Sequence, residues 1–236
     1  MKIRAFTLAE VLVTLGIIGV ISAMTLPTLT KNHQRKVYVT QLQKVYNEFS
    51  QASDSFVTSN NAVNLMEAGL NSQAAVNRFI QSQMKTVKNC ETTFTDCFAS
   101  EYKNMNGAAM TNFNAANSSC YALPSGASVC LTYMGRIRLI GNGFVNILVD
   151  VNGKQGPNIL GRDLFVMGME DDGTIISTFN NVHRVCIPSA ANYDECVAEN
   201  NKTNLQKCQS ATTMLAGSDA GYCFAELLDD GWQMEY

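Results

Sequence analysis

The distribution of hydrophobic residues changes near residue 30. From Phe6 to Leu29 the residues are apolar, small or hydroxylated, and Glu10 is the only charged residue among them. As a helix this stretch would measure about 36 Å, which is enough to cross a bilayer. We therefore expect a membrane-spanning helix over residues 6–29.

Polar residues dominate from Lys31 to Lys36, and a second hydrophobic pattern begins after them. Apolar side chains now recur at intervals of three and four, at Tyr38, Leu42, Val45, Tyr46, Phe49, Ala52 and Phe56. This spacing is typical of an amphipathic helix whose apolar face lies on a protein core. We expect one helix from Phe6 to about Phe56, followed by a turn at residues 59–62.

The rest of the chain predicts a globular head of the α+β class. A second short helix is expected over residues 72–84, an irregular disulfide-rich region over 89–127, and a further helix within 195–214. Turn sequences G-N-G and E-D-D-G separate four strand-like runs, at 129–140, 143–151, 164–169 and 174–179. An antiparallel sheet of about four strands lying on the amphipathic helix is the simplest way to bury these patterns.

The composition favours an extracytoplasmic head. Charged residues make up 16% of the chain, against about 25% in typical soluble domains, and Asn, Ser and Thr take their place. The net charge of −3 includes Lys2 and Arg4, and would become −5 without them. Because the chain has no basic excess, nucleic acid is not expected to be an obligatory partner.

Eight cysteines follow residue 89, and none lies in the apolar run. No C-x-x-C pair occurs, and His33 and His183 lie outside any ligand spacing, so disulfides in an oxidising compartment are favoured over zinc. The sequence does not determine the pairing. Because short loops close most easily, we favour sequential pairs: Cys90 with Cys97, Cys120 with Cys130, Cys186 with Cys196, and Cys208 with Cys223.

Two ordinary interpretations of the N-terminal run leave Glu10 unexplained. A cleaved secretory signal would need an A-x-A site after the run and an uncharged interior. This chain has no convincing A-x-A site there, and Glu10 lies inside the run. A simple membrane anchor, oriented by Lys2 and Arg4, accounts for the length but not for the acid. A carboxylate in lipid is costly and usually has a partner.

A third interpretation rests on a motif: a basic leader, a small residue, Phe-Thr-Leu-x-Glu, an apolar run and a late proline. The matching residues are Lys2, Arg4, Ala5, Phe6, Thr7, Leu8, Glu10 and Pro27. Over about residues 1–56 the chain resembles the type IV prepilins and the type II secretion pseudopilins. The resemblance implies that prepilin peptidase cuts between Ala5 and Phe6 and N-methylates the new terminus. The family usually has Gly where this chain has Ala5; Ala is the nearest in size, so processing is expected at an equal or slower rate.

The resemblance also implies roles for Glu10 and Pro27 in assembly. Cleavage would create an amino group at Phe6, and Glu10 of one subunit would meet the Phe6 amine of its neighbour in a bundle of helices. Such a buried pair specifies geometry more than it adds stability. Pro27 would kink the helix, in a region that can locally unwind in this family.

These expectations define an organisation and a function. Residues 1–5 would be the leader, 6–29 the transmembrane and assembly helix, 30–56 the amphipathic stalk helix, and 57–236 a periplasmic or extracellular globular head. The chain would be a structural subunit of a type IV pilus-like filament, with other copies, prepilin peptidase and the inner-membrane assembly machinery as partners. The alternatives are a pseudopilin of a type II secretion system and a monomeric membrane-anchored binding or adhesin module; nothing in the head distinguishes a pilus from a secretion or DNA-uptake filament.

Sites for chemistry are few. In the loop 150–163, Asp150 and Asn152 have the spacing that opens a calcium loop, but Lys154 stands where another oxygen ligand is wanted, and a specific turn fits equally well. We expect the turn, and no cofactor. His183 and Ser125 lack a nucleophile motif, so the chain is not expected to be an enzyme.

Overall fold

The computed structural model describes residues 7–91, 93–111, 117–135, 143–177, 201–214 and 219–236. The chain forms two compact units, Met1–Val37 and Tyr38–Tyr236. Helix α1 (Leu8–Ser59) belongs to both units and continues through Pro27. Its first part is long and apolar enough, by length and composition, to cross a membrane.

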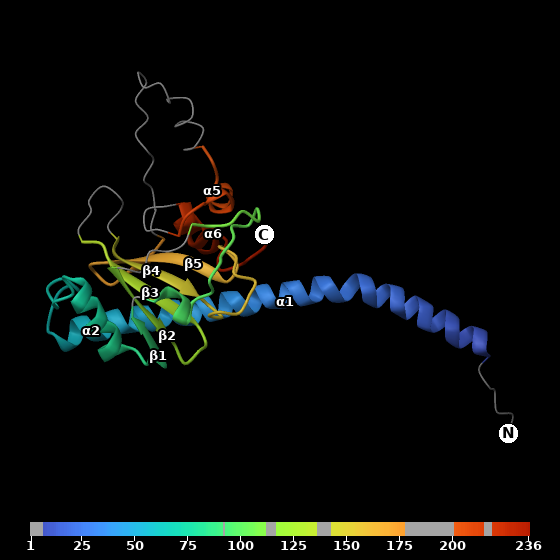
Figure 1. Cartoon of the computed structure of the whole chain (residues 1–236), viewed down its shortest axis with the longest axis horizontal. Helices are drawn as coiled ribbons and strands as arrows, with labels where there is room; N and C mark the ends of the chain where they lie inside the picture. The colour runs from blue at the N-terminus through green and yellow to red at the C-terminus, as the bar shows by residue number, and fades with distance from the viewer. Residues whose placement is uncertain (1–6, 92, 112–116, 136–142, 178–200, 215–218) are drawn as a thin grey trace, which may run out of the picture. The chain divides into compact units, whose positions relative to one another are not determined.

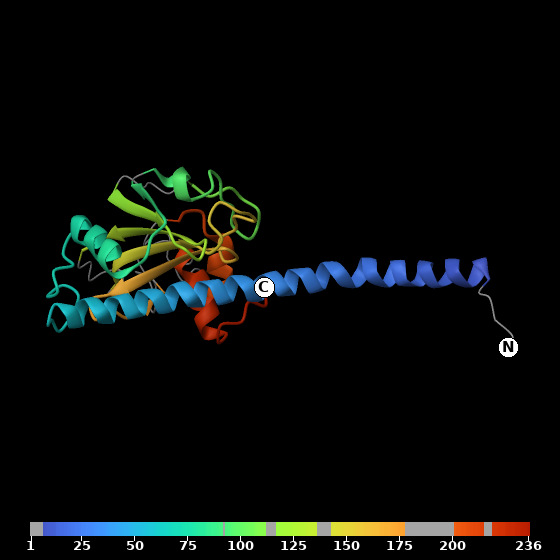
Figure 2. The same ribbon diagram turned by 90° about the horizontal axis from the view of Figure 1, so that it is seen from below.

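In the second unit, one face of α1 is part of the hydrophobic core. Val39, Leu42, Val45, Phe49 and Ala52 are buried there, which confirms the predicted apolar stripe. Tyr38, Tyr46 and Phe56 pack at the margins of the same core. The ribbon of this part of α1 runs along the sheet in Figure 2. Because these residues recur every third or fourth position, they share one side of the helix.

The sheet is a six-stranded antiparallel meander, with strands in the order β1-β2-β3-β4-β5-β6 (Figure 1). The strands are β1 (Lys88–Glu91), β2 (Ser118–Ala122), β3 (Ser128–Tyr133), β4 (Gly143–Asp150), β5 (Leu164–Glu170) and β6 (Ile175–Ile176). The α+β class and the antiparallel sheet on the helix are confirmed. The expected strand count of about four was wrong.

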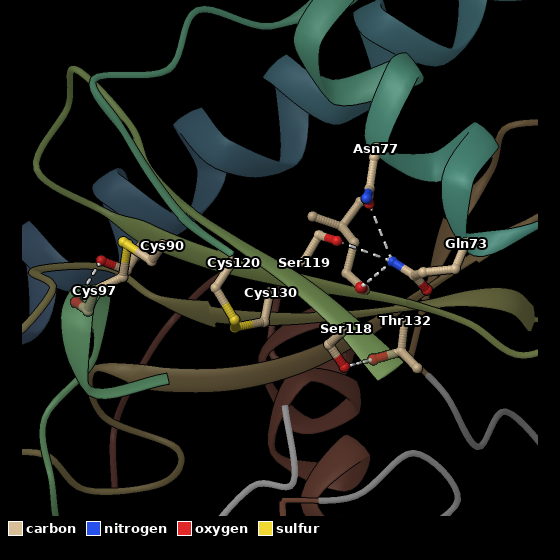
Figure 3. The surroundings of a disulfide bond; sticks show 11 residues. Gln73, Asn77, Cys90, Cys97, Ser118, Ser119, Cys120, Cys130 and Thr132 are labelled. Carbon is tan, nitrogen blue, oxygen red and sulfur yellow. Dashed lines mark hydrogen bonds between the residues drawn. A yellow bond between two sulfur atoms is a disulfide. The ribbon is translucent and has the colours of Figure 1, made fainter. Parts of the chain in front are cut away.

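The two additional strands, β1 and β2, lie in the region for which irregular structure was expected. Their sequences, KNCE and SSCYA, have no apolar alternation that would predict strands. They form strands because tertiary pairing supplies what local propensity lacks. Strand β2 is in register with β3, with Cys120 opposite Cys130, and the Ser118 and Thr132 hydroxyls share a hydrogen bond (Figure 3).

The predicted hairpin at E-D-D-G is confirmed: β5 and β6 pair with Met169 opposite Ile175. Strands β3 and β4 also pair as predicted. The G-N-G turn and the end of the run expected up to residue 140 are not wholly within the described residues, and neither are residues 178 and 179 of the last predicted strand.

The remaining helices are short. They are α2 (Gln73–Gln83), as predicted, then α3 (Phe94–Cys97), α5 (Asn204–Ser210), the 3-10 turn Asp219–Gly221, and α6 (Tyr222–Asp229). Helix α5 covers only part of the range expected for a C-terminal helix, whose residues 195–200 lie outside the described chain. Helices α3 and α6 were not expected, because each is too short to show a periodic pattern.

Candidate functional site

The predicted site residues Ala5 and Phe6 lie outside the described residues, so the site begins at Thr7. Its backbone N–H donates to Glu10 Oε2 over 2.8 Å, and its hydroxyl donates to the same oxygen over 2.8 Å. The Glu10 N–H donates to Thr7 Oγ1 over 3.3 Å. This reciprocal arrangement is a capping box, in which an N-cap hydroxyl and an acid three residues later satisfy two N–H groups that a helix start leaves open.

The capping box is a role for Glu10 that was not expected from the sequence. The signal was available: T-L-A-E before an apolar run has the spacing [ST]-x-x-[DE] of this motif. Both bonds from Thr7 end on Oε2, and Oε1 has no hydrogen-bond partner among the described residues. Glu10 can therefore cap its own helix and still present one carboxylate oxygen to a second group.

The first part of α1 exposes large apolar side chains around its whole circumference. Leu8, Leu12, Leu15, Ile18, Met24 and Leu29 are among those exposed. A helix that is apolar on all sides requires an apolar environment, either lipid or other helices. These residues therefore define a surface that cannot remain in water.

Three hydroxyl groups of this part of the helix form hydrogen bonds within it. Thr14, Thr25 and Thr30 donate to the carbonyls of Val11, Ile21 and Leu26, over 2.9, 2.9 and 2.8 Å. Polar groups in lipid must be paired internally, and these threonines meet that condition. At Pro27 the chain has no N–H to donate to the carbonyl of Ala23, four residues earlier. The helix is necessarily weakened at this position.

The loop that carries Asp150 and Asn152 is a structured connection between β4 and β5. Asp150 is buried; its Oδ2 accepts a hydrogen bond from the Tyr102 hydroxyl and its Oδ1 accepts one from the Asn152 N–H over 3.1 Å. The Asn152 amide donates to the carbonyl of Gly156 over 3.0 Å. These contacts are those of a specific turn, the alternative that we expected over a calcium loop.

A second buried carboxylate closes the same loop. Asp163 accepts hydrogen bonds of 2.7 Å from the backbone N–H groups of Asn158 and Ile159. Burial is the main cause that raises the pKa of Asp150 to about 8 and that of Asp163 to about 6. The Asp150 carboxyl, with the higher pKa, is therefore in large part protonated near neutral pH, and calcium prefers the ionised form. Among the described residues, no cluster of three or more His, Cys, Asp or Glu side chains is placed to hold a metal ion.

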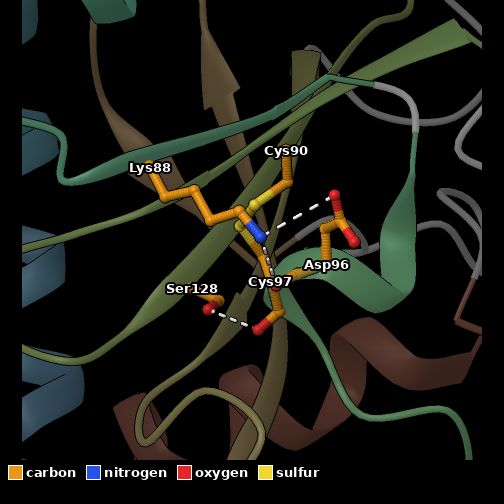
Figure 4. A network of polar contacts seen from close by, with 5 residues as sticks. All are labelled: Lys88, Cys90, Asp96, Cys97 and Ser128. Carbon is orange, nitrogen blue, oxygen red and sulfur yellow. Dashed lines mark hydrogen bonds and ion pairs between the residues drawn. A yellow bond between two sulfur atoms is a disulfide. The ribbon is translucent and has the colours of Figure 1, made fainter.

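Three of the predicted disulfides are present. Cys90–Cys97, Cys120–Cys130 and Cys208–Cys223 match the sequential pairing, whereas Cys186, Cys196 and also His183 lie outside the described residues. The first disulfide joins β1 to α3. The same two elements are linked by an ion pair between Lys88 and Asp96 at 3.7 Å, and the Ser128 hydroxyl of β3 donates to the carbonyl of Cys97 (Figure 4). The second links β2 to β3 directly (Figure 3).

Helix α2 is held on the sheet by one amide side chain. Gln73 Nε2 donates to Ser119 Oγ over 3.3 Å (Figure 3) and to the Leu131 carbonyl over 3.1 Å. Its Oε1 accepts from the Tyr133 N–H over 2.7 Å. These bonds link the first residue of α2 to β2 and β3, and Val76, Phe79 and Ile80 of the same helix are buried in the core.

Comparison with known proteins yielded no relative: no family model, no curated protein and no solved structure matches this chain. Its function therefore has to be inferred from its own residues.

Proposed function

We propose that this chain is a structural subunit of a type IV pilus-like filament, processed by prepilin peptidase between Ala5 and Phe6 and polymerised through its N-terminal helix. In this proposal the unassembled subunit crosses the inner membrane once and holds its head in the periplasm. The inner-membrane assembly machinery then moves it into the filament. Catalysis has no part in this role.

The observation that carries the proposal is that α1 combines three different parts in one helix. A single helix begins with a capped acid, continues as an exposed apolar surface and ends as part of the core of the head. A membrane anchor alone requires the apolar surface but not the acid. A subunit that exchanges lipid for neighbouring helices requires both, because the acid restricts the register in which those helices pack.

The Phe6 amine of a neighbouring copy is the proposed partner of Glu10. The capping bonds end on Oε2. Oε1 can therefore accept a hydrogen bond from the new amine while both capping bonds remain in place. The ion pair would then form only when two helices lie at the correct stagger. At any other stagger a charge would remain unpaired in an apolar environment, which costs several kcal/mol, on the order of 3 to 5.

This role of Glu10 is tested by comparing Glu10→Gln with Thr7→Val. Glutamine at this position still completes a capping box but has no charge, whereas Thr7→Val removes the capping hydroxyl and leaves the charge. We expect Glu10→Gln to lower the assembled fraction at least about tenfold, because the charge sets the register. Thr7→Val should lower it much less, and sedimentation of sheared filaments measures both.

Three further outcomes separate the alternatives. Normal assembly of Glu10→Gln would refute the register role, and loss of assembly in Thr7→Val alone would assign Glu10 to capping only. A wild-type chain that stays monomeric in the membrane while its head binds a ligand would favour the anchored binding module.

Mass analysis of the native N-terminus tests processing by prepilin peptidase. A methylated Phe6 at the N-terminus is expected, and an intact Met1 would exclude processing.

A further inference from the structure

The head has a groove on one flank of α1, with a cavity of about 440 Å³. Its walls come from α1, from the end of α2 and from the turn between β2 and β3. Lys44, Glu48 and Gln51 line it from α1, Lys85 from the residues after α2, and Ser125 from the turn. Val76, Phe79 and Ile80 bury α2 in the core, so that the opening lies between packed elements.

Two cations face this groove from different elements. Lys44 and Lys85 are exposed, and in the described part of the chain neither forms a hydrogen bond or an ion pair. Glu48 is the one acid in the lining, so that the groove has a net positive charge. The groove thus offers cations to an acidic, oxygen-rich partner.

An acidic turn lies on the other flank of α1. Glu170, Asp171 and Asp172 connect β5 to β6. Partial burial and the adjacent Asp172 and Asp171 raise the pKa of Glu170, as expected where like charges are held together. A cation brought to this turn would relieve that repulsion.

The acidic turn has a defined conformation. The Glu170 N–H donates to the Thr174 carbonyl over 2.9 Å, and the Thr174 N–H donates to Asp172 Oδ1 over 2.8 Å. The Leu65 N–H donates to the Asp171 carbonyl over 2.8 Å. A preorganised turn loses little entropy on binding, so it is suited to insertion into a groove.

The two surfaces cannot meet within one head, because they lie on different sides of the molecule. The strand order separates the β2–β3 turn from the β5–β6 turn. On α1, Ala52 lines the groove, whereas Ser53 lies against the acidic turn, where a Cβ on Gly173 would be 3.0 Å from Ser53 Cβ. Complementary surfaces at two different places on one subunit produce a head-to-tail contact, which can repeat without closing.

We propose that the acidic turn Glu170–Asp172 of one copy docks into the Lys44–Lys85 groove of the next copy. This inference rests on the proposed filament function and specifies how neighbouring heads recognise one another. The lysines pair with the carboxylates of the turn.

A zero-length carbodiimide crosslink on the full-length chain tests the contact directly. Unlabelled and ¹⁵N-labelled chains are mixed in detergent, concentrated and treated, and crosslinked peptides are identified by mass. We expect mixed-isotope peptides that join Lys44 or Lys85 to the peptide containing Glu170 and Asp172. The Lys88–Asp96 pair, at 3.7 Å within one chain, is the internal control: its appearance without any mixed-isotope Lys44 or Lys85 peptide would overturn the proposal.

Charge reversal tests the contact in assembly. Lys44→Glu with Lys85→Glu, and separately Glu170→Lys with Asp172→Lys, should each lower the assembled fraction at least about tenfold, because like charges then face each other. The fourfold variant, with both surfaces reversed, should restore assembly. Lys154→Glu, on the exposed loop after β4, is the matched control and should assemble normally.

The outcomes separate this inference from the function on which it rests. Normal assembly of either double variant would overturn the docking contact. So would a fourfold variant that stays defective although Trp232 fluorescence reports a native head. Both results would leave the filament proposal unaffected. Failure of the wild-type chain to polymerise would reject the filament proposal, and the crosslink would then decide whether the heads associate through these surfaces.

Discussion

At the scale of single residues, the capping role of Glu10 is compatible with the assembly role that we propose for it. It caps its own helix through Oε2, and the proposed assembly requires only its second oxygen. An acid in an apolar run usually has a distant partner, but here a local partner already lowers the cost of the carboxylate. The charge remains available for a neighbour.

The buried acids of the head predict an unusual dependence of stability on pH. Asp150 has a pKa of about 8 in the fold and near 4 when unfolded. Between these values the folded state binds more protons than the unfolded state, so the free energy of unfolding falls as pH rises. The slope is at most about 1.4 kcal/mol per pH unit for this carboxyl. Asp163, with a pKa of about 6, adds to it at the acidic end.

Asp150→Asn should remove most of this dependence. The Asn side chain keeps an oxygen that can accept from the Asn152 N–H and an uncharged amide beside the Tyr102 hydroxyl. Because Asn does not ionise, the variant should be more stable than the wild type at pH 8 and similar to it at pH 5. Urea unfolding of the full-length chain in detergent, followed by fluorescence of the single Trp232, measures this. Asp54→Asn, at an exposed position of α1, is the control. A wild-type free energy that rises from pH 5 to 8 would contradict the prediction.

At the scale of elements, the β4–β5 loop is fitted closely to the C-terminal segment. Gly161 has a φ of +80°, and a Cβ there would contact Met105 Cε and lie 3.0 Å from Cys208 Sγ and 3.2 Å from Cys223 Sγ. The loop also forms backbone hydrogen bonds with Lys103, between the Lys103 N–H and the Asn158 carbonyl and between the Leu160 N–H and the Lys103 carbonyl. Packing of three chain segments around one glycine leaves no space for a side chain.

Gly161→Ala should therefore destabilise the head by about 2 to 4 kcal/mol, from backbone strain together with steric overlap. Gly126→Ala is the matched control, because Gly126 has a φ of +89° but no atom lies within 4 Å of the position that a Cβ would take. The control should lose only about 1 kcal/mol. Equal losses in the two variants, measured by urea unfolding, would show that the contact with the disulfide contributes nothing.

At the scale of the whole molecule, the C-terminal segment closes the head. Trp232 packs edge-on against Tyr46 of α1 at 5.4 Å and against Phe224 of α6 at 5.7 Å between ring centroids. The Cys208–Cys223 disulfide holds α5 to α6. The segment thus connects the end of the chain to the amphipathic part of α1, and its release should expose the core beneath it.

Replacing Cys208 and Cys223 with Ala should lower the free energy of unfolding by about 3 kcal/mol, because the disulfide closes a loop of 15 residues. We expect limited proteolysis to remove the C-terminal segment before the rest of the head is cut. Replacing Cys90 and Cys97, which close a loop of 7 residues, should leave that segment protected. Simultaneous digestion of both variants throughout the head would contradict this order.

The sequence alone was sufficient for features that depend on neighbours along the chain. The periodic apolar residues of α1, the helix α2 and the E-D-D-G hairpin followed from spacing, because helical periodicity and turn preference are local. Spacing did not determine the disulfide pairing, but three disulfides match the short-range pairs that loop closure favoured. The Thr7–Glu10 capping box is also local, and its signature is present in T-L-A-E.

Only the tertiary structure determined the features that join distant segments. Strands β1 and β2 have no apolar alternation. Strand β2 exists because β3 supplies its hydrogen-bond partners, and β1 exists because β2 does the same for it. Asp150 and Asp163 read as polar loop residues, but the fold buries them near Tyr102, and burial is the main cause that changes their protonation. The groove and the acidic turn likewise acquire a meaning only when the sheet places them on different flanks of α1. Burial and long-range pairing depend on which segments meet, and that information is not present in any local stretch of the chain.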